Sequence, residues 1–426
     1  MKIFKFGGGS VQNADGVRQL EKILRLYPDE PLVVVISAIG KTTNLMEKIL
    51  EAWYHNSSSL EEHLQTLYNN HFEIIRQLDE EMDKIDKMVG GVQPLFDDLA
   101  VILQNSPSGN YDYDYDRIVS FGELISTTLI STYLNINGLQ NQWSDARQLI
   151  KTDSAHREAG VNWKETVPLI QNHVFNYFNK NQGNILITQG FIGASPNGKT
   201  TTLGREGSDY TAAVFGFSLN ATDVTIWKDV PGLFNADPRI FPEAVKLEQI
   251  PYKEAIELSY YGASIIHPKT LKPLQNKNIP LYVKFFFHPE ESGSVISAKE
   301  NHTHIPSYIF KKNQILISIY PKDFSFIAVN NLSEIFAILS HQKIKVNLMQ
   351  NSALSFSICF DYHQTKVERL IEELKCNYAV KYNYPIELTT IRHYNNESLQ
   401  KVLQHKKILI EQRNRTTYQL VLKEIK

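Results

Sequence analysis

Short apolar runs alternate with longer amphipathic segments over residues 1–289. The run LVVVI is rich in β-branched side chains, which is typical of a strand buried on both faces of a parallel sheet. We expect strands at Lys2–Phe6, Leu32–Ile36, Ile185–Ile187, Asp223–Trp227 and Pro280–Phe287. We expect helices at Ala14–Leu26, within 56–103, at Asp116–Leu134 and at Tyr252–Tyr261, with a loop at Ser106–Asp116. This alternation predicts an α/β fold with a doubly wound, mainly parallel sheet.

The pattern changes after a polar stretch at 290–306, which contains Pro, Gly and Ser and which we interpret as a linker. The region 307–426 then follows a strand–helix–strand–strand–helix–strand order, the ferredoxin-like βαββαβ arrangement. The expected elements are Ile315–Tyr320, Leu332–Gln342, Lys345–Ser352, Ser355–Asp361, Thr365–Leu374 and Tyr378–Tyr382. Further strands at Ile386–His393 and around Gln412–Thr417 predict a second, partial unit of the same kind.

Composition narrows the class of protein. Of the 426 residues, 42% are hydrophobic and 21% are charged, as in an ordinary folded domain protein. The net charge of -2 gives no reason to expect nucleic acid or an anionic membrane as partner. Cys359 and Cys376 stand alone, without the spacing of a metal site. Because no secretory signal precedes the first strand and no long apolar run follows, we expect a cytoplasmic protein without protein-held metal.

The residues with candidate chemistry lie in loops that follow the strands, where open α/β sheets bind ligands. Residues 200–217 begin as a polar, Gly-rich loop and continue as an apolar helix. A helix N-terminus offers free N–H groups and a positive dipole end to an anion. Arg205 adds a planar fork suited to a carboxylate or phosphate, and Ser208 or Asp209 is placed to cap the helix. The alternative is a capped helix after a surface turn.

The loop KFGGGS follows the first strand. Its three glycines let the backbone curl around a phosphate, and Lys5 supplies a positive charge. The order differs from a Walker motif because the lysine precedes the glycines. A plain turn is the alternative for a glycine triplet considered alone.

Three further loops are weaker candidates. In the loop Ser37–Asn44, Thr42 or Thr43 could contact a ligand or cap the next helix. Glu123 follows Gly122 near a helix start, where it could favour the dipole or pair with a substrate ammonium group. The loop Trp227–Arg239 is rich in Pro, Gly and Asn and could hold a nucleotide base. Its Lys228 and Arg239, considered singly, are more typical of solvated surface charge.

Considered together, these stretches resemble the motif series of the aspartate kinases, which belong to the amino-acid kinase superfamily. The motifs are KFGGGSV, SFGEL, TQGFIG, TTLGREGSDYTAA, IWKDVPGLFNADPR and YYGASIIHPKTL, in the expected order from Lys2 to about Pro289. KVNLMQNSALSFSICFD and ILIEQRNRTTYQLVL resemble parts of two C-terminal ACT regulatory domains. The resemblance implies a kinase domain over 1–289, and ACT units over 307–426. At this length we expect no additional dehydrogenase domain.

The resemblance implies ATP-dependent phosphorylation of the side-chain carboxylate of L-aspartate, with Mg²⁺. The product is 4-phospho-L-aspartate, and the reaction is the first step toward lysine, threonine and methionine. The physics agrees, because a carboxylate that attacks a polyanion needs positioning and positive potential rather than a covalent nucleophile. Alternatives are a kinase of another small carboxylate such as glutamate, and a non-catalytic amino-acid sensor.

By motif, the resemblance also assigns residues. Lys5 would neutralise the transferring phosphoryl group, and Asp209 would orient the lysines and the phosphates. Aspartate would be held by Thr43, Glu123, Arg205, Gly207 and Ser208, with Glu123 taking the ammonium group. ATP would be held by Gly7, Gly8, Gly9, Ser10, Lys228, Asp229, Phe234, Arg239 and Ser264.

The regulatory region would bind an amino acid, expected to be lysine, at a subunit interface of a homodimer or higher homo-oligomer. The implied effector residues are Asn347, Met349, Gln350, Asn351 and Ser352. An edge strand in a dimer contact, without effector binding, is the alternative for this stretch.

Three positions depart from the family pattern. Gly9 replaces the usual Thr, and Glu206 replaces a Gly beside Arg205, which brings a negative charge near a site for an acidic substrate. Ser264 stands where many members have a phosphate-contacting Lys. We therefore expect either Lys228 or Lys269 to supply the missing charge.

Overall fold

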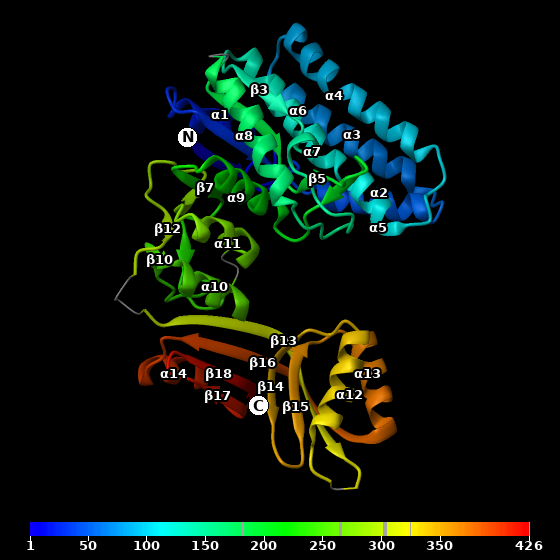
Figure 1. Ribbon diagram of the computed structural model, residues 1–426, viewed down its shortest axis with the longest axis vertical. Helices are drawn as coiled ribbons and strands as arrows, with labels where there is room; N and C mark the ends of the chain where they lie inside the picture. The colour runs from blue at the N-terminus through cyan, green and yellow to red at the C-terminus, as the bar shows by residue number, and fades with distance from the viewer. Residues whose placement is uncertain (181–182, 264–265, 301–304, 324, 426) are drawn as a thin grey trace. The chain divides into compact units, whose positions relative to one another are not determined.

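The computed structural model describes residues 1–425 except 181–182, 264–265, 301–304 and 324. They cluster into two compact units. The first unit comprises Met1–Leu233, Lys246–Ile256 and Ile266–Asn301, and the second unit comprises Phe234–Val245, Glu257–Ile265 and His302–Lys426. Figure 1 labels the helices and many of the strands of both units.

The first unit is built on an eight-stranded sheet in the order β10-β12-β11-β7-β1-β2-β4-β3. All its pairs are parallel except β11 with β12. The strands are β1 Lys2–Phe6, β2 Leu32–Ile36, β3 Asn141–Ser144, β4 Ile185–Gln189, β7 Asp223–Lys228, β10 Gln249–Pro251, β11 Leu281–Phe285 and β12 Ser294–Ser297. Two small ribbons pair β5 Ile192–Ala194 with β6 Thr200–Thr202, and β8 Leu233–Phe234 with β9 Lys246–Leu247.

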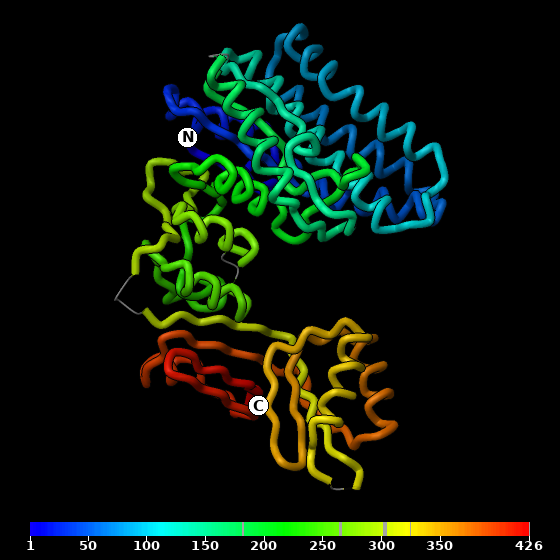
Figure 2. Tube along the Cα trace, in the orientation of Figure 1, coloured from blue at the N-terminus to red at the C-terminus, as the bar shows by residue number. Residues whose placement is uncertain are grey.

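Helices cover this sheet (Figures 1 and 2). Among them, α2 contacts α3, α3 contacts α4, and α4 contacts α6. Asn13 caps the first helix by accepting from the backbone N–H of Gly16. The helices are α1 Ala14–Arg25, α2 Thr42–Tyr54, α3 Ser59–Leu78, α4 Met82–Leu103, α5 Tyr111–Val119, α6 Phe121–Ile136, α7 Ala146–Leu149, α8 Trp163–Asn179, α9 Gly207–Leu219 and α11 Pro268–Asn276. Helix α10, Tyr252–Tyr261, begins in the first unit and ends in the second. Helix α9 is apolar on nearly every face, so it is buried.

The second unit contains a six-stranded antiparallel sheet in the order β14-β15-β13-β16-β18-β17. Its strands are β13 Ser307–Pro321, β14 Val346–Asn351, β15 Phe356–Asp361, β16 Tyr378–Arg392, β17 Lys406–Arg413 and β18 Thr417–Glu424. Its helices are α12 Val329–His341, α13 Gln364–Asn377 and α14 Asn396–Leu403. The order β13-α12-β14-β15-α13-β16 confirms the expected βαββαβ unit.

Alternation along β13 builds two cores in the second unit. Ile315 and Ile317 face a core that includes Ile335 of α12. The intervening Leu316 packs with Leu388 and other apolar residues on the opposite face. Because successive side chains point to opposite faces of a sheet, a single apolar run serves both cores.

Two expected features near the domain boundary differ from the structure. The stretch 290–306, expected as a linker, contains β12, which pairs with β10 and β11 in the first unit. Strand β12 has the sequence SVIS, whose few apolar residues stand among Ser and Gly, so local composition favours a loop. Phe234–Val245, expected within the first domain, clusters with the second unit.

Three other expectations were wrong in detail. The loop expected at Ser106–Asp116 contains the start of α5, which Asn110 caps by accepting from Tyr113 N. The single helix expected at Asp116–Leu134 is broken at Ser120 into α5 and α6. The strands expected on either side of Pro385 are one strand, β16, whose pairing with β13 shifts register near that proline.

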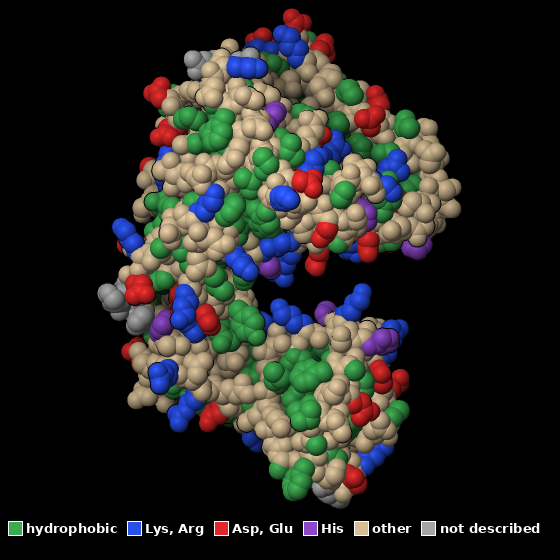
Figure 3. All heavy atoms as spheres, in the orientation of Figure 1, with side chains coloured by type: hydrophobic (Ala, Val, Ile, Leu, Met, Phe, Trp, Pro, Cys, Tyr) green, Lys and Arg blue, Asp and Glu red, His purple; other side chains and the backbone are tan. Residues whose placement is uncertain are grey.

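The surface and the helices carry two further findings. Basic and acidic side chains are interspersed on the face shown in Figure 3, as the small net charge leads one to expect. No helix within the described residues has the length and apolarity needed to cross a membrane.

Candidate active site

Three neighbouring strands end level with one another at the candidate site. Phe6 of β1 pairs in register with Ile36 of β2 on one side and with Trp227 of β7 on the other. The loops that begin at Gly7, Ser37 and Asp229 therefore leave the sheet at the same end of its strands. Open α/β sheets bind ligands beyond the carboxyl ends of their parallel strands. We call this region, together with the N-terminus of α9 and the first turn of α6, the strand-end site.

A buried ion pair joins Lys5 to Asp209 at the centre of the strand-end site. The Lys5 Nζ lies 2.6 Å from Asp209 Oδ1, and both side chains are buried. Burial alone would raise the pKa of Asp209, but the charges of Lys5 and Lys228 and the Lys5 contact hold that pKa below its usual value. Asp209 is therefore ionised at neutral pH, and it holds the Lys5 ammonium group at the end of β1.

The loop after β1 forms a backbone cradle. A Cβ on Gly8 would lie 2.5 Å from the Ala38 carbonyl oxygen, so only glycine allows this close approach of two loops. Ser10 is buried and donates its hydroxyl to the Trp227 carbonyl at 3.2 Å, which ties the loop to β7. A Cβ on Gly9 would have no neighbour within 4 Å, so a side chain would fit there. The departure from Thr at Gly9 therefore leaves the cradle intact.

Glu123 lies in the first turn of α6 and is almost completely buried. Its Oε1 accepts from the Ala38 N–H at 3.3 Å, and its Oε2 has no hydrogen-bond partner among the described residues. Burial raises the pKa of Glu123 to about 8, despite opposing hydrogen bonds and the charge of Lys5. A buried carboxyl with an unused oxygen is suited to receive a cation.

The N-terminus of α9 differs from the expected cap. Neither Ser208 nor Asp209 caps the helix, because the N-cap residue is Glu206 and its side chain makes no capping bond. Ser208 instead packs so close to Gly190 that a Cβ there would lie 2.4 Å from the Ser208 Cβ. The glycine of the TQG motif is thus explained by close packing against α9. Gly207 is similarly close to Phe191.

The remaining residues expected to contact aspartate differ in exposure. Arg205 lies on the loop before α9 and is exposed to solvent. Thr43 lies in the first turn of α2 and is partly buried. Thr42 donates its hydroxyl to the Ile39 carbonyl at 2.6 Å. Neither threonine is the N-cap of α2, which is Lys41.

Lys228 and Lys269 occupy different environments. Lys228, at the end of β7, is near enough to Asp209 to lower its pKa. Lys269, in α11, donates to the Leu203 carbonyl at 3.0 Å and lies 4.8 Å from the Tyr210 ring centre. Burial lowers the pKa of Lys269. Ser264 lies outside the described residues. Of the two lysines, Lys228 is the one whose charge acts on the strand-end site.

We therefore expect Lys228→Met to lower turnover by roughly 30- to 100-fold, a loss of about 2–3 kcal/mol of transition-state stabilisation. Lys269→Met should change turnover less and should mainly lower the melting temperature, because its charge contacts a backbone carbonyl and a ring. Steady-state kinetics with saturating substrates would measure both. Near-normal turnover in the Lys228→Met variant would contradict this assignment.

The other residues expected at the nucleotide are divided between the two units. Asp229 follows β7 and is exposed. Phe234 and Arg239 belong to the second unit. There Arg239 is exposed and pairs with Asp237 at 2.7 Å. Their roles at the nucleotide stay predictions.

The expected effector residues lie on β14, an edge strand of the six-stranded sheet, except Ser352, which directly follows it. Asn347 is engaged within the unit, because its Oδ1 accepts from Lys311 Nζ at 2.9 Å and its Nδ2 donates to Gln314 at 2.8 Å. Ser352 exchanges a hydrogen bond with Ser355. The exposed residues of the set are Met349, Gln350 and Asn351, with Ser352.

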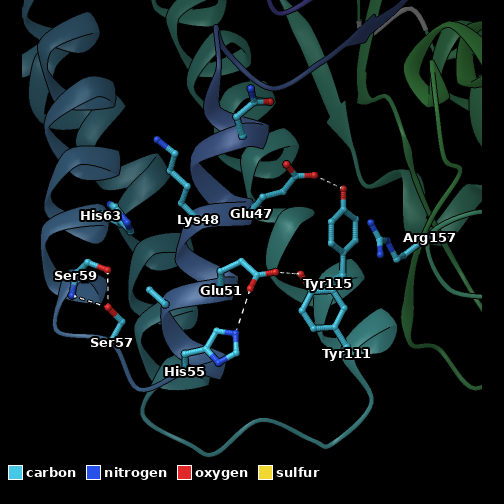
Figure 4. A pocket seen from close by; sticks show the side chains of 12 residues that line it. Glu47, Lys48, Glu51, His55, Ser57, Ser59, His63, Tyr111, Tyr115 and Arg157 are labelled. Atoms are coloured by element: carbon cyan, nitrogen blue, oxygen red, sulfur yellow. Dashed lines mark hydrogen bonds and ion pairs between the residues drawn. The ribbon is translucent and has the colours of Figure 1, made fainter. Parts of the chain in front are cut away.

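A pocket of about 740 Å³, which the sequence analysis did not predict, lies between α2, the start of α3 and α5. Figure 4 shows Glu47 and Glu51 of α2 pointing toward Tyr115 and Tyr111 of α5. Tyr115 donates to Glu47 at 2.8 Å, and Tyr111 donates to Glu51. The Arg157 guanidinium lies 4.4 Å from the Tyr115 ring centre. These pairs clamp α2, which carries Thr43, against the helix that precedes Glu123.

Asp116 is a buried carboxylate that the sequence analysis did not single out. It is fully buried and accepts from Thr202 Oγ1 at 2.6 Å, from His156 Nδ1 at 2.8 Å and from the Arg157 N–H at 3.1 Å. Burial raises the pKa of Asp116, while these hydrogen bonds oppose the rise. The carboxylate thereby joins α5 to β6, the strand that leads into the Arg205 loop.

Comparisons with known proteins place these motifs in context. Residues 1–284 match the model of the amino acid kinase family. The chain is 32% identical over 363 residues to lysine-sensitive aspartokinase 3 of Escherichia coli, covering 84% of this chain and 78% of that protein. It is 29% identical over 390 residues to the chloroplastic aspartokinase 1 of Arabidopsis thaliana, covering 88% of this chain and 67% of that protein.

Solved structures extend the similarity to the whole chain. E. coli aspartokinase III in complex with lysine and aspartate, in the T-state, superposes with a TM-score of 0.83 at 27% identity, over 100% of this chain and 96% of that one. The same enzyme with aspartate and ADP, in the R-state, gives 0.82 over 99% of this chain and 96% of that one. The similarity confirms the expected fold class, an α/β kinase domain followed by ACT-type units.

Proposed function

Because the chain belongs to the amino acid kinase family and, within it, to the aspartokinases, we propose that the strand-end site phosphorylates the side-chain carboxylate of L-aspartate with ATP. The product is 4-phospho-L-aspartate, the entry compound for lysine, threonine and methionine synthesis. The observation that carries the proposal is the buried Lys5–Asp209 pair, 2.6 Å apart. The pair lies in the strand-end site together with the glycine cradle and Glu123.

The main barrier to this reaction is electrostatic, since two anions must meet. Lys5, held by Asp209, places a positive charge at the end of β1, and Lys228 adds a second. The loop Gly7–Gly9 can surround phosphate oxygens with backbone N–H groups. Such preorganised charge acts strongly in a site that excludes water. These residues therefore bind, orient and neutralise the phosphates, without a covalent intermediate on the protein.

The donor set also fits Mg²⁺ held mainly by the nucleotide. No group of three His, Cys, Asp or Glu side chains within the described residues could form a complete metal cage. Mg²⁺ in kinases needs only one or two carboxylates together with phosphate oxygens and water, and Asp209 provides such a carboxylate beside the cradle. When bound, the ion neutralises phosphate charge.

Aspartate is a zwitterion with an extra carboxylate, and the site offers complementary groups. Glu123 has an unused buried oxygen for the ammonium group. Arg205, Gly207, Ser208 and Thr43 are the candidates for the carboxylates, around the positive end of α9. The negative charge of Glu206 does not argue against an acidic substrate, because its carboxylate is bound by the His267 N–H at 2.8 Å.

Trapping of the acyl phosphate tests the proposal. The full chain is incubated with ATP, Mg²⁺ and hydroxylamine, and hydroxamate is measured with aspartate and, separately, with glutamate. Hydroxamate with aspartate alone supports the proposal, and hydroxamate with glutamate alone supports the alternative kinase. No hydroxamate with either acid, together with measurable lysine binding, supports the non-catalytic sensor.

We also propose that lysine binds at β14 and that this edge strand joins two copies of the chain. The strand is at the sheet edge, and Met349, Gln350 and Asn351 are exposed on it. Exposed edge strands are ready to pair with another chain. Sedimentation with and without lysine measures the assembly. Absence of lysine inhibition in the hydroxamate assay would remove the effector role and leave the kinase proposal intact.

A further inference from the structure

Glu206 has a backbone conformation that most side chains avoid. Its φ of 54° lies in the left-handed region, which typically costs a non-glycine residue about 1–2 kcal/mol. It stands directly between Arg205 and the first residue of α9. A glycine would avoid this strain, so the contacts of the Glu206 side chain are of interest.

The Glu206 carboxylate interacts with a different helix. Its Oε2 accepts from the backbone N–H of His267 at 2.8 Å. His267 is the N-cap residue of α11, and its Nδ1 accepts from the Lys269 N–H at 3.2 Å. The carboxylate thus lies at the positive end of α11, where a negative charge is favoured. A charge-assisted hydrogen bond of this kind is stronger than a neutral one.

A second contact joins the same loop to α11 on the other side of Arg205. Lys269 Nζ donates to the Leu203 carbonyl at 3.0 Å and lies 4.8 Å from the Tyr210 ring centre. The loop that carries Arg205 is therefore held to α11 by Leu203 before it and by Glu206 after it.

We propose that Glu206 is a positioning residue. Its hydrogen bond to the His267 N–H, which we call the latch, holds the Leu203–Gly207 loop against α11 and so orients Arg205 toward the substrate carboxylate. The inference rests on the proposed role of Arg205 in binding aspartate. The same hydrogen bond keeps the negatively charged Glu206 carboxylate at the N-terminus of α11. Released from α11, that carboxylate would compete with aspartate for the neighbouring guanidinium group.

The other end of α9 supplies a matched control. Asn220, the C-cap of α9, also has a left-handed backbone, with a φ of 48°. Lys277, the C-cap of α11, donates to the Phe217 carbonyl at 2.7 Å and to the Asn220 side chain. The two helices are thus tied at both ends, and only the Glu206 end is next to Arg205.

The test compares Glu206→Gly, Glu206→Gln and Asn220→Gly by steady-state hydroxamate formation and by melting temperature. We expect E206G to raise the KM for aspartate about tenfold, the effect of one lost charge-assisted hydrogen bond, with the KM for ATP and the kcat within about twofold of the parent. E206Q should recover most of the affinity, because its amide oxygen still accepts. N220G should leave all three kinetic parameters unchanged.

His267→Pro removes the donor of the same bond, together with the ring cap on the Lys269 N–H, and keeps the test open if E206G fails to fold. The φ of His267 is -62°, which proline adopts, and proline has no N–H. H267P should raise the KM for aspartate as E206G does, and the double variant should be no worse than either single one.

Several results would overturn the latch. An unchanged or lowered KM for aspartate in E206G would do so, and so would an equal rise in N220G, because α9–α11 packing rather than the latch would then be responsible. A parent protein that forms no hydroxamate with aspartate would instead refute the proposed function.

Discussion

Replacing Lys5 with methionine is expected to lower turnover by at least about 1,000-fold, which corresponds to roughly 4 kcal/mol of lost transition-state stabilisation. Lys5 supplies the charge nearest the end of β1, where phosphate and carboxylate are proposed to meet. Methionine has nearly the same length and no charge, so the change removes electrostatics and little volume. The hydroxamate assay at saturating aspartate and ATP measures the effect on kcat.

The same substitution also disturbs the fold, because it leaves Asp209 as a buried carboxylate without its 2.6 Å partner. Breaking a buried pair from one side typically costs about 3–5 kcal/mol of stability. The double variant Lys5→Met with Asp209→Asn removes both charges and is the matched control. It should regain most of the melting temperature while remaining inactive.

The two effects are therefore separable. If the double variant recovered both stability and turnover, the loss in Lys5→Met would come from misfolding, and Lys5 would have no role in phosphoryl transfer. A double variant that stays folded and inactive excludes misfolding as the cause and assigns the loss of turnover to the Lys5–Asp209 pair. In Lys5→Met the KM for aspartate should change less than the kcat, because Lys5 is proposed to face the transferring group.

The five inner strands of the eight-stranded sheet, β11, β7, β1, β2 and β4, could be predicted from the sequence because their signal is local. The run LVVVI of β2 is β-branched and buried along its whole length, and the observed strand has the predicted bounds Leu32–Ile36. Once such strands are parallel neighbours, their carboxyl ends lie side by side, so the loops that follow them lie close together. The convergence of the Gly7 loop and the Ser37 loop follows from this geometry, and register confirms it.

What the sequence could not show depends on contacts between distant residues. The stretch YDYDYD reads as a polar loop, yet Tyr115 and Asp116 become buried because their polar atoms find partners 68 and 86 residues away, Glu47 and Thr202. Hydropathy treats each of these groups as solvated. Only the fold reveals that they are satisfied inside, where an unpaired polar group would be costly.

The helix cap at α9 illustrates a different limit. Ser208 and Asp209 have the residue types that favour an N-cap, but both lie within the first turn and are needed elsewhere. Asp209 pairs with Lys5, and Ser208 packs on Gly190. Because Ser208 and Asp209 make these other contacts, their local preference for the N-cap position is not realised. The N-cap is Glu206, whose backbone is left-handed.

Replacing Glu123 with glutamine is expected to weaken aspartate binding and, at the same time, to stabilise the protein at alkaline pH. Glutamine keeps the shape and the acceptor for the Ala38 N–H, but it offers no charge to the substrate ammonium group. Truncating one partner of a buried charge pair typically costs about 2–5 kcal/mol of binding, so we expect the KM for aspartate to rise at least about 30-fold. The KM for ATP should change little.

The stability effect has the opposite sign because the pKa of Glu123 is raised by burial to about 8 in the folded chain. Below the unfolded pKa of an ordinary Glu, both states hold the proton and the two proteins should have equal stability. Between that value and about 8 the unfolded chain releases its proton while the folded chain keeps it, so the parent loses stability as pH rises. The advantage of the glutamine variant should therefore grow from pH 4.5 and level off above pH 8.

Melting curves from pH 4.5 to 9 and aspartate titrations over the same range test both halves. The parent should bind aspartate more tightly as pH rises toward 8, since the ammonium group pairs with the ionised carboxylate and deprotonation of Glu123 precedes binding. Glu123→Gln should show neither this rise nor the loss of stability. Asp15→Asn on the exposed surface of α1 is the control, because it removes a carboxylate without burial. A glutamine variant that bound aspartate as tightly as the parent would exclude Glu123 from the ammonium site, whatever its melting temperature.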